Sequence, residues 1–395
     1  MAIATKGQTG LTGNTAVAYA MKQINPDVFP AYPITPSTAI VEDFAGFVAD
    51  GAVTSELITV ESEHSAMSAC IGASAAGARV MTATSAQGLA LMWEMLYIAS
   101  GMRLPIVIAN VNRALSAPIN IHCDHSDSMG ARDSGWIQLY SETVQEAYDN
   151  MFMAMRIAED TNVLLPAMVC FDGFITSHAI ENITLVEDAD AREFIGQYKP
   201  GHSLLNVDNP ATYGAMTLQD TYITFKHQQS QAIARAKGVA ASVGAEFGKK
   251  FGRAYGLFEG YRLEDAEEVI VILNSAAGTT KVAVDELRKQ GKKAGVLRPR
   301  LFRPFPFEEI AKALSGAKAI ACLDRVDSMS GFGGPLFNEV RSALYELDKR
   351  PKVMSRIYGL GGRDYKVKDA LEVYAELEKT AASGKVETLQ KYITL

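Results

Sequence analysis

Two patterns of apolar and polar positions alternate along the first 180 residues of the chain. Short runs rich in β-branched residues, such as Leu57–Val60 and Leu104–Val111, predict buried strands. Longer stretches between them, such as 65–77 and 144–159, have the composition and length of helices. Strands that alternate with helices at this spacing predict βαβ units and a parallel sheet. The fold class that we expect is therefore α/β.

The same pattern returns after a weakly patterned middle section. Between residues 187 and 261 turn residues interrupt the periodicity, and 228–248 read as a helical connection. Strands are predicted again at 268–273, 294–297 and 319–323. A chain of 395 residues exceeds one ordinary core. We therefore place a domain boundary near Gly260, which gives a first domain of residues 1–260 and a smaller parallel α/β domain of residues 261–395.

Polar residues follow four of the predicted strands in the first domain. These are Thr35, Glu63, Ser85 and Arg113. Because parallel strands end at the same edge of a sheet, we expect the four residues to gather there, where ligands bind in open α/β sheets. Thr35 lies in a loop that two prolines hold extended, so its hydroxyl is available.

Glu63 stands where a predicted strand passes into a helix of small residues that permits close approach of its neighbours. A carboxylate at such a position is desolvated unless a donor hydrogen-bonds it. Its position leaves two interpretations open, a catalytic carboxylate or a helix-start carboxylate that binds free backbone amides. The role of Arg113 is open in the same way, because an arginine at the end of a strand is also a common structural ion-pair partner.

Three further clusters have plainer explanations. His122 and His125, with Asp124 and Asp127, have a spacing that suits a metal site, but we favour the interpretation that these polar side chains of the loop 114–135 hydrogen-bond backbone groups. The basic cluster Arg298, Arg300 and Arg303 is typical of a solvated face or of a contact for an acidic partner. The glycines between residues 7 and 13 do not match the dinucleotide-binding motif.

Composition narrows the class of protein. The net charge of −7 argues against a nucleic-acid partner. No apolar run is long enough to span a bilayer, and the N-terminus lacks the apolar core of a signal peptide, so we expect no membrane association. Widely separated cysteines without C-x-x-C spacing give no zinc or iron–sulfur motif and suit a reducing cytoplasm. The cysteines are Cys70, Cys123, Cys170 and Cys322.

The candidate residues belong to motifs whose combination is specific. In chain order the motifs are Tyr32-Pro33-Ile34-Thr35-Pro36-Ser37, Glu61-Ser62-Glu63-His64-Ser65-Ala66, Thr84-Ser85-Ala86-Gln87-Gly88, Arg113-Ala114-Leu115-Ser116, Asp124-His125-Ser126-Asp127, Phe171-Asp172-Gly173-Phe174 and Tyr358-Gly359-Leu360-Gly361-Gly362-Arg363-Asp364. Over essentially its whole length, the chain resembles the α subunits of multi-subunit 2-oxoacid:ferredoxin oxidoreductases, and among them most closely those that act on pyruvate.

The resemblance implies a fold and a set of roles. The expected architecture is a pyrimidine-type thiamine diphosphate-binding domain followed by a transketolase C-terminal-like α/β domain. Glu63 matches the glutamate that hydrogen-bonds N1′ of the cofactor's aminopyrimidine and promotes loss of the thiazolium C2 proton. Arg113 matches the arginine that holds the substrate carboxylate, and Thr35 the threonine whose hydroxyl contacts substrate. Three residues beside Thr35 are implied to shape the pocket wall, namely Tyr32, Pro33 and Ile34.

The implied activity is the reversible oxidative decarboxylation of pyruvate with coenzyme A to acetyl-CoA and CO₂, with electrons passed to ferredoxin. The glycine-rich diphosphate motif of thiamine enzymes is missing, and Phe171-Asp172-Gly173-Phe174 does not replace it. The chain therefore carries half an active site and no metal ligands of its own. We expect Mg²⁺ and the diphosphate on a β subunit, and 4Fe-4S clusters on partner chains of a complex that includes a γ subunit and a ferredoxin-like δ subunit.

Two alternatives remain open at this point. One alternative is that the substrate is a branched-chain or aryl 2-oxoacid, because relatives with such substrates share many of these sequence motifs. A threonine in the Tyr32–Ser37 loop, with no second arginine there, favours a small monocarboxylic acid such as pyruvate. The other alternative is a non-catalytic scaffold subunit, in which Glu63 only caps a helix.

Overall fold

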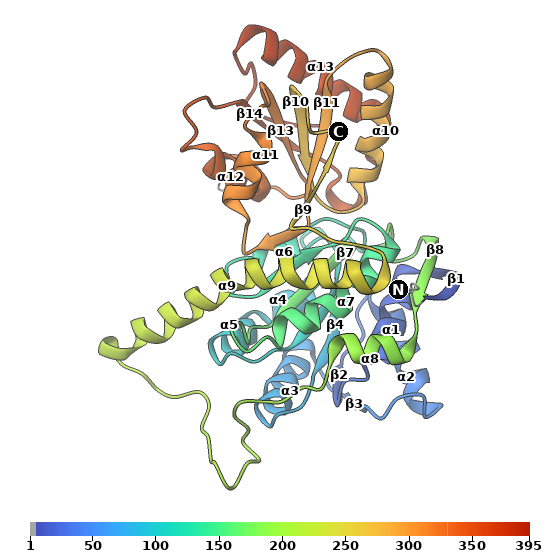
Figure 1. The fold of residues 1–395 in the computed structure, drawn as a ribbon, viewed down its shortest axis with the longest axis vertical. Helices are drawn as coiled ribbons and strands as arrows, with labels where there is room; N and C mark the ends of the chain where they lie inside the picture. Colours follow the sequence, from blue (N-terminus) through green and yellow to red (C-terminus); the bar gives the residue numbers. More distant parts are fainter. Residues whose placement is uncertain (1–4, 330) are drawn as a thin grey trace.

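The computed structural model describes residues 5–329 and 331–395 and has two lobes stacked along its long axis (Figure 1). Each lobe is built on a largely parallel sheet that is packed against helices, which confirms the predicted α/β fold. No helix in the described ranges combines the length and apolarity needed to cross a membrane. Residues 1–4, part of the N-terminus that is expected to carry no signal peptide, lie outside the described residues.

The first sheet has five strands in the spatial order β12-β6-β7-β5-β4, and within it β12 pairs antiparallel with β6. Two more strands, β2 and β3, pair in parallel beside it, and a single parallel bridge from Val28 to Val80 joins them to the β4 side. The strands are β2 (Val28–Ala31), β3 (Glu56–Thr59), β4 (Met81–Thr84), β5 (Val107–Asn112), β6 (Ile137–Tyr140), β7 (Ala167–Asp172) and β12 (Leu301–Arg303).

Alternate residues of this sheet serve two different apolar cores. On β5, Val107 and Ala109 pack in the core that contains α7 (Val144–Ala158), whereas Ile108 packs in the core that contains α3 (Glu63–Ala75). Helices therefore cover both faces, and α7 is buried along nearly its whole length. The other helices of this lobe are α1 (Gly13–Ile24), α2 (Thr38–Ala49), α4 (Ala86–Leu91), α5 (Trp93–Gly101), α6 (Ser126–Gly130), α8 (Asp188–Ile195) and α9 (Gln219–Phe251).

The glycine- and threonine-rich N-terminal stretch forms a strand, which sequence patterning did not predict. β1 (Thr5–Thr12) pairs antiparallel with β8 (Ile180–Val186). Thr12 caps α1, because its hydroxyl accepts a hydrogen bond from the Thr15 N–H. Asn14, in the first turn of α1, is buried, and its amide donates to the Pro36 carbonyl at 2.7 Å. Asn14 thus anchors the loop that carries Thr35.

The second lobe has a six-stranded sheet in the order β15-β14-β13-β10-β11-β9, in which β9 runs antiparallel to β11. The three strands predicted here are present as β10, β11 and β13. The division of the chain near residue 260 stays a prediction, and β12 returns to the first sheet from beyond it. The elements are β9 (Phe258–Tyr261), β10 (Glu268–Ile272), β11 (Ala294–Pro299), β13 (Ala319–Asp324), β14 (Lys352–Ile357), β15 (Gln390–Tyr392), α10 (Ala276–Lys289), α11 (Phe307–Leu314), α12 (Pro335–Leu344), η1 (Leu360–Gly362) and α13 (Val367–Ser383).

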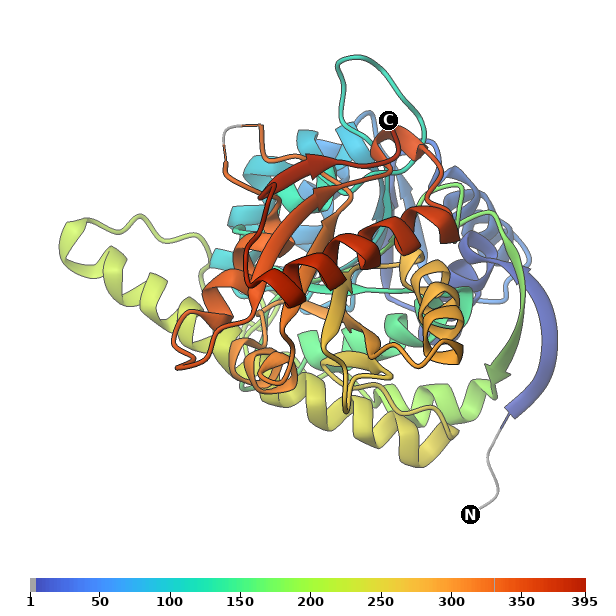
Figure 2. The same cartoon turned by 90° about the horizontal axis from the view of Figure 1, so that it is seen from above.

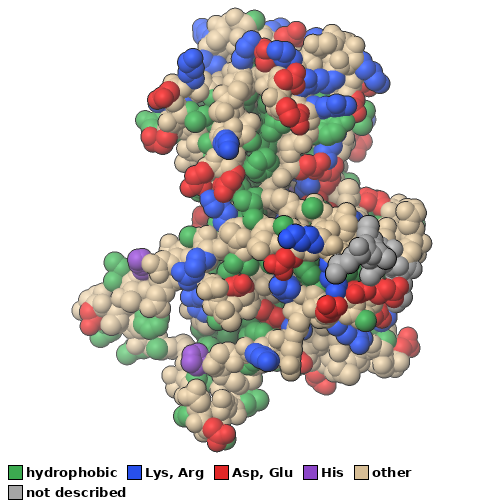
Figure 3. All heavy atoms as spheres, in the orientation of Figure 1, with side chains coloured by type: hydrophobic (Ala, Val, Ile, Leu, Met, Phe, Trp, Pro, Cys, Tyr) green, Lys and Arg blue, Asp and Glu red, His purple; other side chains and the backbone are tan. Residues whose placement is uncertain are grey.

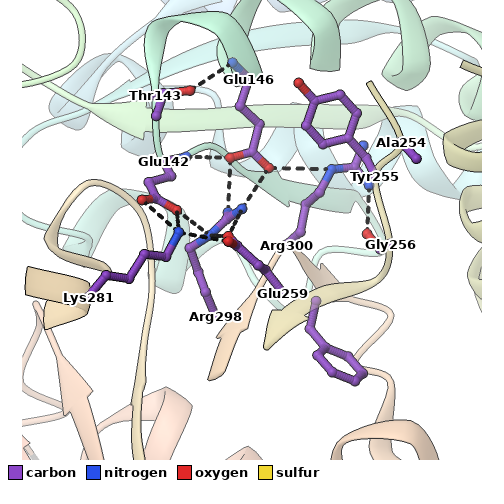
Figure 4. Close-up of a pocket in the computed structure, with 11 residues that line it drawn as sticks. Glu142, Thr143, Glu146, Ala254, Tyr255, Gly256, Glu259, Lys281, Arg298 and Arg300 are labelled. Atoms are coloured by element: carbon purple, nitrogen blue, oxygen red, sulfur yellow. Dashed lines mark hydrogen bonds and ion pairs between the residues drawn. The ribbon is translucent and has the colours of Figure 1, made fainter. Parts of the chain in front are cut away.

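The basic cluster near residue 300 lies between the lobes, so its assignment to a solvated or partner-facing surface is wrong for two of its three members. Arg298 is buried and pairs with Glu142 and Glu146 of the first lobe at 2.9 and 3.0 Å (Figure 4). Arg300 is also buried and donates to Asn150 Oδ1 at 2.7 Å. A cavity of about 430 Å³ adjoins these side chains, where Lys281 and Glu259 extend the charge network.

Candidate functional site

Glu63 is the first residue of α3 and lies at the junction that the sequence predicted. The helix is capped by its neighbour, because the Ser62 hydroxyl accepts a hydrogen bond from the Ser65 N–H at 3.2 Å. Glu63 itself is only 7% exposed, and no residue in the described ranges hydrogen-bonds its carboxylate. Capping therefore does not account for this buried acceptor, and the helix-cap interpretation loses its main support.

Gly88 in α4 provides the surface against which the Glu63 carboxylate rests. A Cβ atom at position 88 would lie 2.8 Å from Glu63 Oε1 and 2.4 Å from Thr84 Oγ1, so a larger residue would displace both side chains. The hydroxyls of Thr84 and Ser85 and the amide of Gln87 are buried without hydrogen-bond partners among the described residues. Such atoms cost about 1–3 kcal/mol each when unpaired. Thr84 Oγ1 lies beside the Glu63 carboxylate over Gly88, and Ser85 and Gln87 belong to the same strand-to-helix turn, so this turn offers a place for a polar ligand.

Asp127 connects this region to the end of the next strand. Its Oδ2 accepts hydrogen bonds from the backbone N–H groups of Ala86 and Arg113, both at 3.1 Å. Its Oδ1 accepts from Asn112 Nδ2 at 2.8 Å. Burial raises the pKa of Asp127 to about 6, although these hydrogen bonds act to lower it. The side chain therefore fixes the carboxyl ends of β4 and β5 relative to each other. In the sequence Asp127 appeared only as a member of a polar loop, because spacing does not reveal burial.

Arg113 is buried beside the Thr35 loop. Its Nη1 donates to the Thr35 carbonyl at 2.9 Å, and its Nε donates to the Asn120 carbonyl at 3.0 Å. No described residue hydrogen-bonds its Nη2, which leaves a donor for a ligand. Burial lowers the pKa of Arg113, yet the guanidinium remains charged at neutral pH. Through these contacts the structure brings Thr35, Glu63, Ser85 and Arg113 to one edge of the sheet, as expected from strand direction.

The pocket-wall residues that the resemblance implied lie on the outside of this region. Tyr32 and Pro33 are exposed, and Ile34 is half-buried, all on the loop that follows β2. Thr35 is also exposed. The edge of the sheet is therefore accessible to a second molecule on the side of this loop.

The two histidines of the polar loop do not converge. His122 is exposed, and its ring lies 5.0 Å from the ring of Phe174 between centroids. His125 is buried, with Nε2 2.8 Å from Asp172 Oδ1. Cys123 Sγ, His125 and Asp172 lie close enough together to hold an ion. However, the Arg325 guanidinium already pairs with the other Asp172 oxygen at 3.2 Å.

Asp172 therefore joins the two lobes through hydrogen bonds and charge. Ser275 and Asn274 of the second lobe both donate to its carboxylate, with Asn274 Nδ2 at 3.0 Å. Burial acts to raise the pKa of Asp172, but Arg325 and the hydrogen bond from His125 hold it well below its ordinary value. The backbone hydrogen bonds favoured on sequence grounds are made by Asp124, which accepts from the Ser126 N–H at 2.9 Å, whereas His125 bonds the side chain of Asp172 outside the loop.

Comparison with known proteins identifies the family. A family model described as pyruvate flavodoxin/ferredoxin oxidoreductase, thiamine diphosphate-binding, matches residues 19–245, and one for pyruvate:ferredoxin oxidoreductase core domain II matches residues 266–370. Pyruvate synthase subunit PorA of Thermotoga maritima is 55% identical over 359 residues, which cover 91% of each chain. Ketoisovalerate oxidoreductase subunit VorA of Pyrococcus horikoshii is 46% identical over 378 residues, which cover 95% of each chain.

A solved structure shares the fold. It is the 2-oxoglutarate:ferredoxin oxidoreductase from Magnetococcus marinus with 2-oxoglutarate, coenzyme A and succinyl-CoA bound. The match has a TM-score of 0.74 at 19% identity and covers 94% of this chain and 65% of that one. The resemblance stated from the motifs is thus confirmed. The chain belongs to the pyruvate flavodoxin/ferredoxin oxidoreductase family and carries its thiamine diphosphate-binding domain followed by core domain II.

Proposed function

We propose that this chain is the α subunit of a pyruvate synthase, which converts pyruvate and coenzyme A to acetyl-CoA and CO₂ and passes electrons to ferredoxin, reversibly. The observation that carries the proposal is the buried Glu63 carboxylate, which rests on Gly88 with its oxygens free to accept a hydrogen bond. The identity to PorA over nine tenths of both chains supports pyruvate as the substrate. The VorA relatives, at 46% identity, make a branched-chain 2-oxoacid the second candidate.

The residues around Glu63 fit the aminopyrimidine of thiamine diphosphate. The carboxylate would accept a hydrogen bond from a protonated ring nitrogen, and the unpaired polar atoms of Ser85 and Gln87 would be available to a nitrogen-rich ring. Bound thiamine diphosphate supplies a nucleophilic carbon and an electron sink for decarboxylation of 2-oxoacids. Glu63 contributes to that chemistry by holding a proton at the ring nitrogen N1′.

Arg113 and Thr35 are proposed to position the substrate. Arg113 Nη2 remains to donate a charge-assisted hydrogen bond to the pyruvate carboxylate, while Nε and Nη1 hold the guanidinium in place. The exposed Thr35 hydroxyl contacts the substrate, and the residues before it, Tyr32, Pro33 and Ile34, shape the wall of the pocket. Asp127 is a positioning residue, because it acts through the backbone of Ala86 and Arg113.

The remaining parts of the enzyme are assigned to partner chains. A β subunit supplies the diphosphate and Mg²⁺ sites, and γ and ferredoxin-like δ subunits complete the complex, with the 4Fe-4S clusters on partners of this chain. The four cysteines here are buried free thiols, which supports that assignment. A cytoplasmic location stays a prediction, based on the cysteine pattern.

Glu63→Gln in the assembled complex tests the proposal. The amide cannot hold the proton at N1′, so pyruvate turnover should fall by about 10²–10⁴-fold, the usual contribution of a proton-transfer group. Glu61→Gln is the matched control, because Glu61 is an exposed carboxylate two residues away. Subunit composition measured by native mass spectrometry should be unchanged in both variants. Turnover of Glu63→Gln at the level of Glu61→Gln would indicate a scaffold subunit instead.

A further inference from the structure

We infer that residues 205–228, here called the arm, bind the polypeptide that completes the thiamine diphosphate site, an inference that rests on the proposed function. The arm consists of a loop and the first turns of α9, and it projects from the body of the first lobe in two perpendicular views (Figures 1 and 2). Nearly all of its residues are exposed.

The arm is apolar to a degree that is unusual for a projecting segment. Seven of its large apolar side chains are more than half exposed, whereas Tyr213 is partly buried and packs against the body of the lobe, and hydrophobic side chains are visible along the projection in Figure 3. Exposed apolar surface that gathers in one place is typical of a protein–protein contact. Six of these residues are Leu205, Val207, Met216, Leu218, Ile223 and Phe225.

Both ends of the arm are attached to helices that flank Glu63. Just before the arm begins, the Leu204 N–H donates to the Ala75 carbonyl, at the last residue of α3, at 2.9 Å. Just after it ends, Gln229 Nε2 donates to Ser100 Oγ of α5 at 2.9 Å. Helix α3 begins with Glu63 itself. The arm is therefore attached to α3, the helix that begins with Glu63, and to α5.

The surface between Glu63 and the arm is also suited to contact. After His64, α3 carries no charged residue, so its outward side presents small residues such as Ala69 and Gly72. On α5, the exposed rings of Trp93 and Tyr97 stack edge to face with centroids 5.4 Å apart. Glu94 of α5 pairs with His64 at 3.6 Å, so the start of α5 lies close to the Glu63 end of α3, and both helices lead from there to the attachment points of the arm.

The distance from Glu63 to the arm is within the reach of the completing polypeptide. The 13 residues of α3 span about 20 Å. A domain of roughly 150 residues is about 35–40 Å across. A domain that covers Glu63 therefore reaches the attachment points of the arm. A second copy of this chain would bring another Glu63 rather than the missing diphosphate site, so it does not explain why the arm and the half-site share two helices.

Charge placed on the arm tests the inference in the co-expressed complex. Ile223→Asp combined with Phe225→Asp should weaken retention of the diphosphate-binding subunit at least tenfold, measured by native mass spectrometry during dilution. Val282→Asp combined with Tyr345→Asp is the matched control, because these exposed apolar residues lie on the second lobe. Circular dichroism should show that all variants fold. At concentrations that restore assembly, the arm variant should turn over pyruvate at the wild-type rate per complex, unlike Glu63→Gln.

A photo-crosslinking residue at position 223 identifies the occupant directly. Crosslinks to the diphosphate-binding subunit would support the inference. Crosslinks only to a second copy of this chain or to an iron–sulfur subunit would overturn it, as would equal retention in the arm and control variants. None of these outcomes depends on whether Glu63→Gln is active, so the inference and the proposed function can fail separately.

Discussion

The guanidinium of Arg113 donates a hydrogen bond to the backbone carbonyl of Thr35 at 2.9 Å, across 78 residues of sequence. This contact joins the end of β5 to the loop after β2, and it uses the backbone of Thr35 rather than its hydroxyl. The two side chains proposed to bind substrate can therefore be tested independently. A change of the Thr35 side chain leaves the backbone carbonyl that holds the Arg113 guanidinium in place.

Thr35→Val should lower kcat/KM for pyruvate by about tenfold, the worth of one hydrogen bond. Arg113→Lys should lower it by about 10–100-fold, because lysine keeps the charge but lacks the planar fork and the bond to Thr35. Steady-state kinetics with pyruvate measures both, and subunit composition should not change. If both variants retained wild-type kcat/KM, the assignment of this edge to the substrate would be wrong.

Gly88→Ala should reduce the thiamine diphosphate content of the complex. The new methyl group would lie 2.8 Å from Glu63 Oε1 and 2.4 Å from Thr84 Oγ1, so both side chains must move. Thiamine content, measured after size-exclusion chromatography, reports the loss. Gly46→Ala in α2 is the control, since a Cβ there meets nothing within 4 Å. Full cofactor content in Gly88→Ala would mean that Glu63 does not face the ring.

Asp127→Asn should lower kcat/KM for pyruvate. The complex should keep its bound cofactor and its partner subunits. An amide nitrogen in place of one carboxylate oxygen cannot accept from Ala86, Arg113 or Asn112. In the wild type, the same support weakens when Asp127 is protonated, so kcat/KM should fall as the pH drops through about 6, the raised pKa of Asp127. The variant should lack this acidic limb. A pH profile identical in shape to that of the wild type would show that Asp127 does not position the site.

Asp172→Asn should lower the free energy of unfolding by about 3–5 kcal/mol, because the buried Arg325 loses its counter-charge. Ser275→Ala, which removes a single donor to Asp172, should cost only about 1 kcal/mol. The pKa of Asp172 is lower in the folded state than its ordinary value of 3.8. Its contribution is therefore present above pH 3.8 and lost as the pH falls below it. Denaturant unfolding across acidic pH should show this loss in the wild type and not in Asp172→Asn.

Much of the fold could be predicted from the sequence, because the spacing of apolar residues and the alternation of strands and helices can be seen in short stretches of the chain. The junction at Glu63 and the meeting of Thr35 with Arg113 were predicted in this way. The roles of Asn14, Asp127 and Arg298 were not, because each depends on burial by segments far away in the chain. The strand β1 was missed for a related reason. Its glycines disfavour an isolated strand, and pairing with β8 supplies the stabilisation.

The position of the cofactor ring in the assembled complex tests the central claim most directly. A cryo-EM map of the complex with thiamine diphosphate bound should place ring atom N1′ at about 2.7–3.2 Å from a carboxylate oxygen of Glu63, with the diphosphate held by a neighbouring polypeptide. A ring located away from Glu63, or a complex that binds no thiamine diphosphate, would contradict the account.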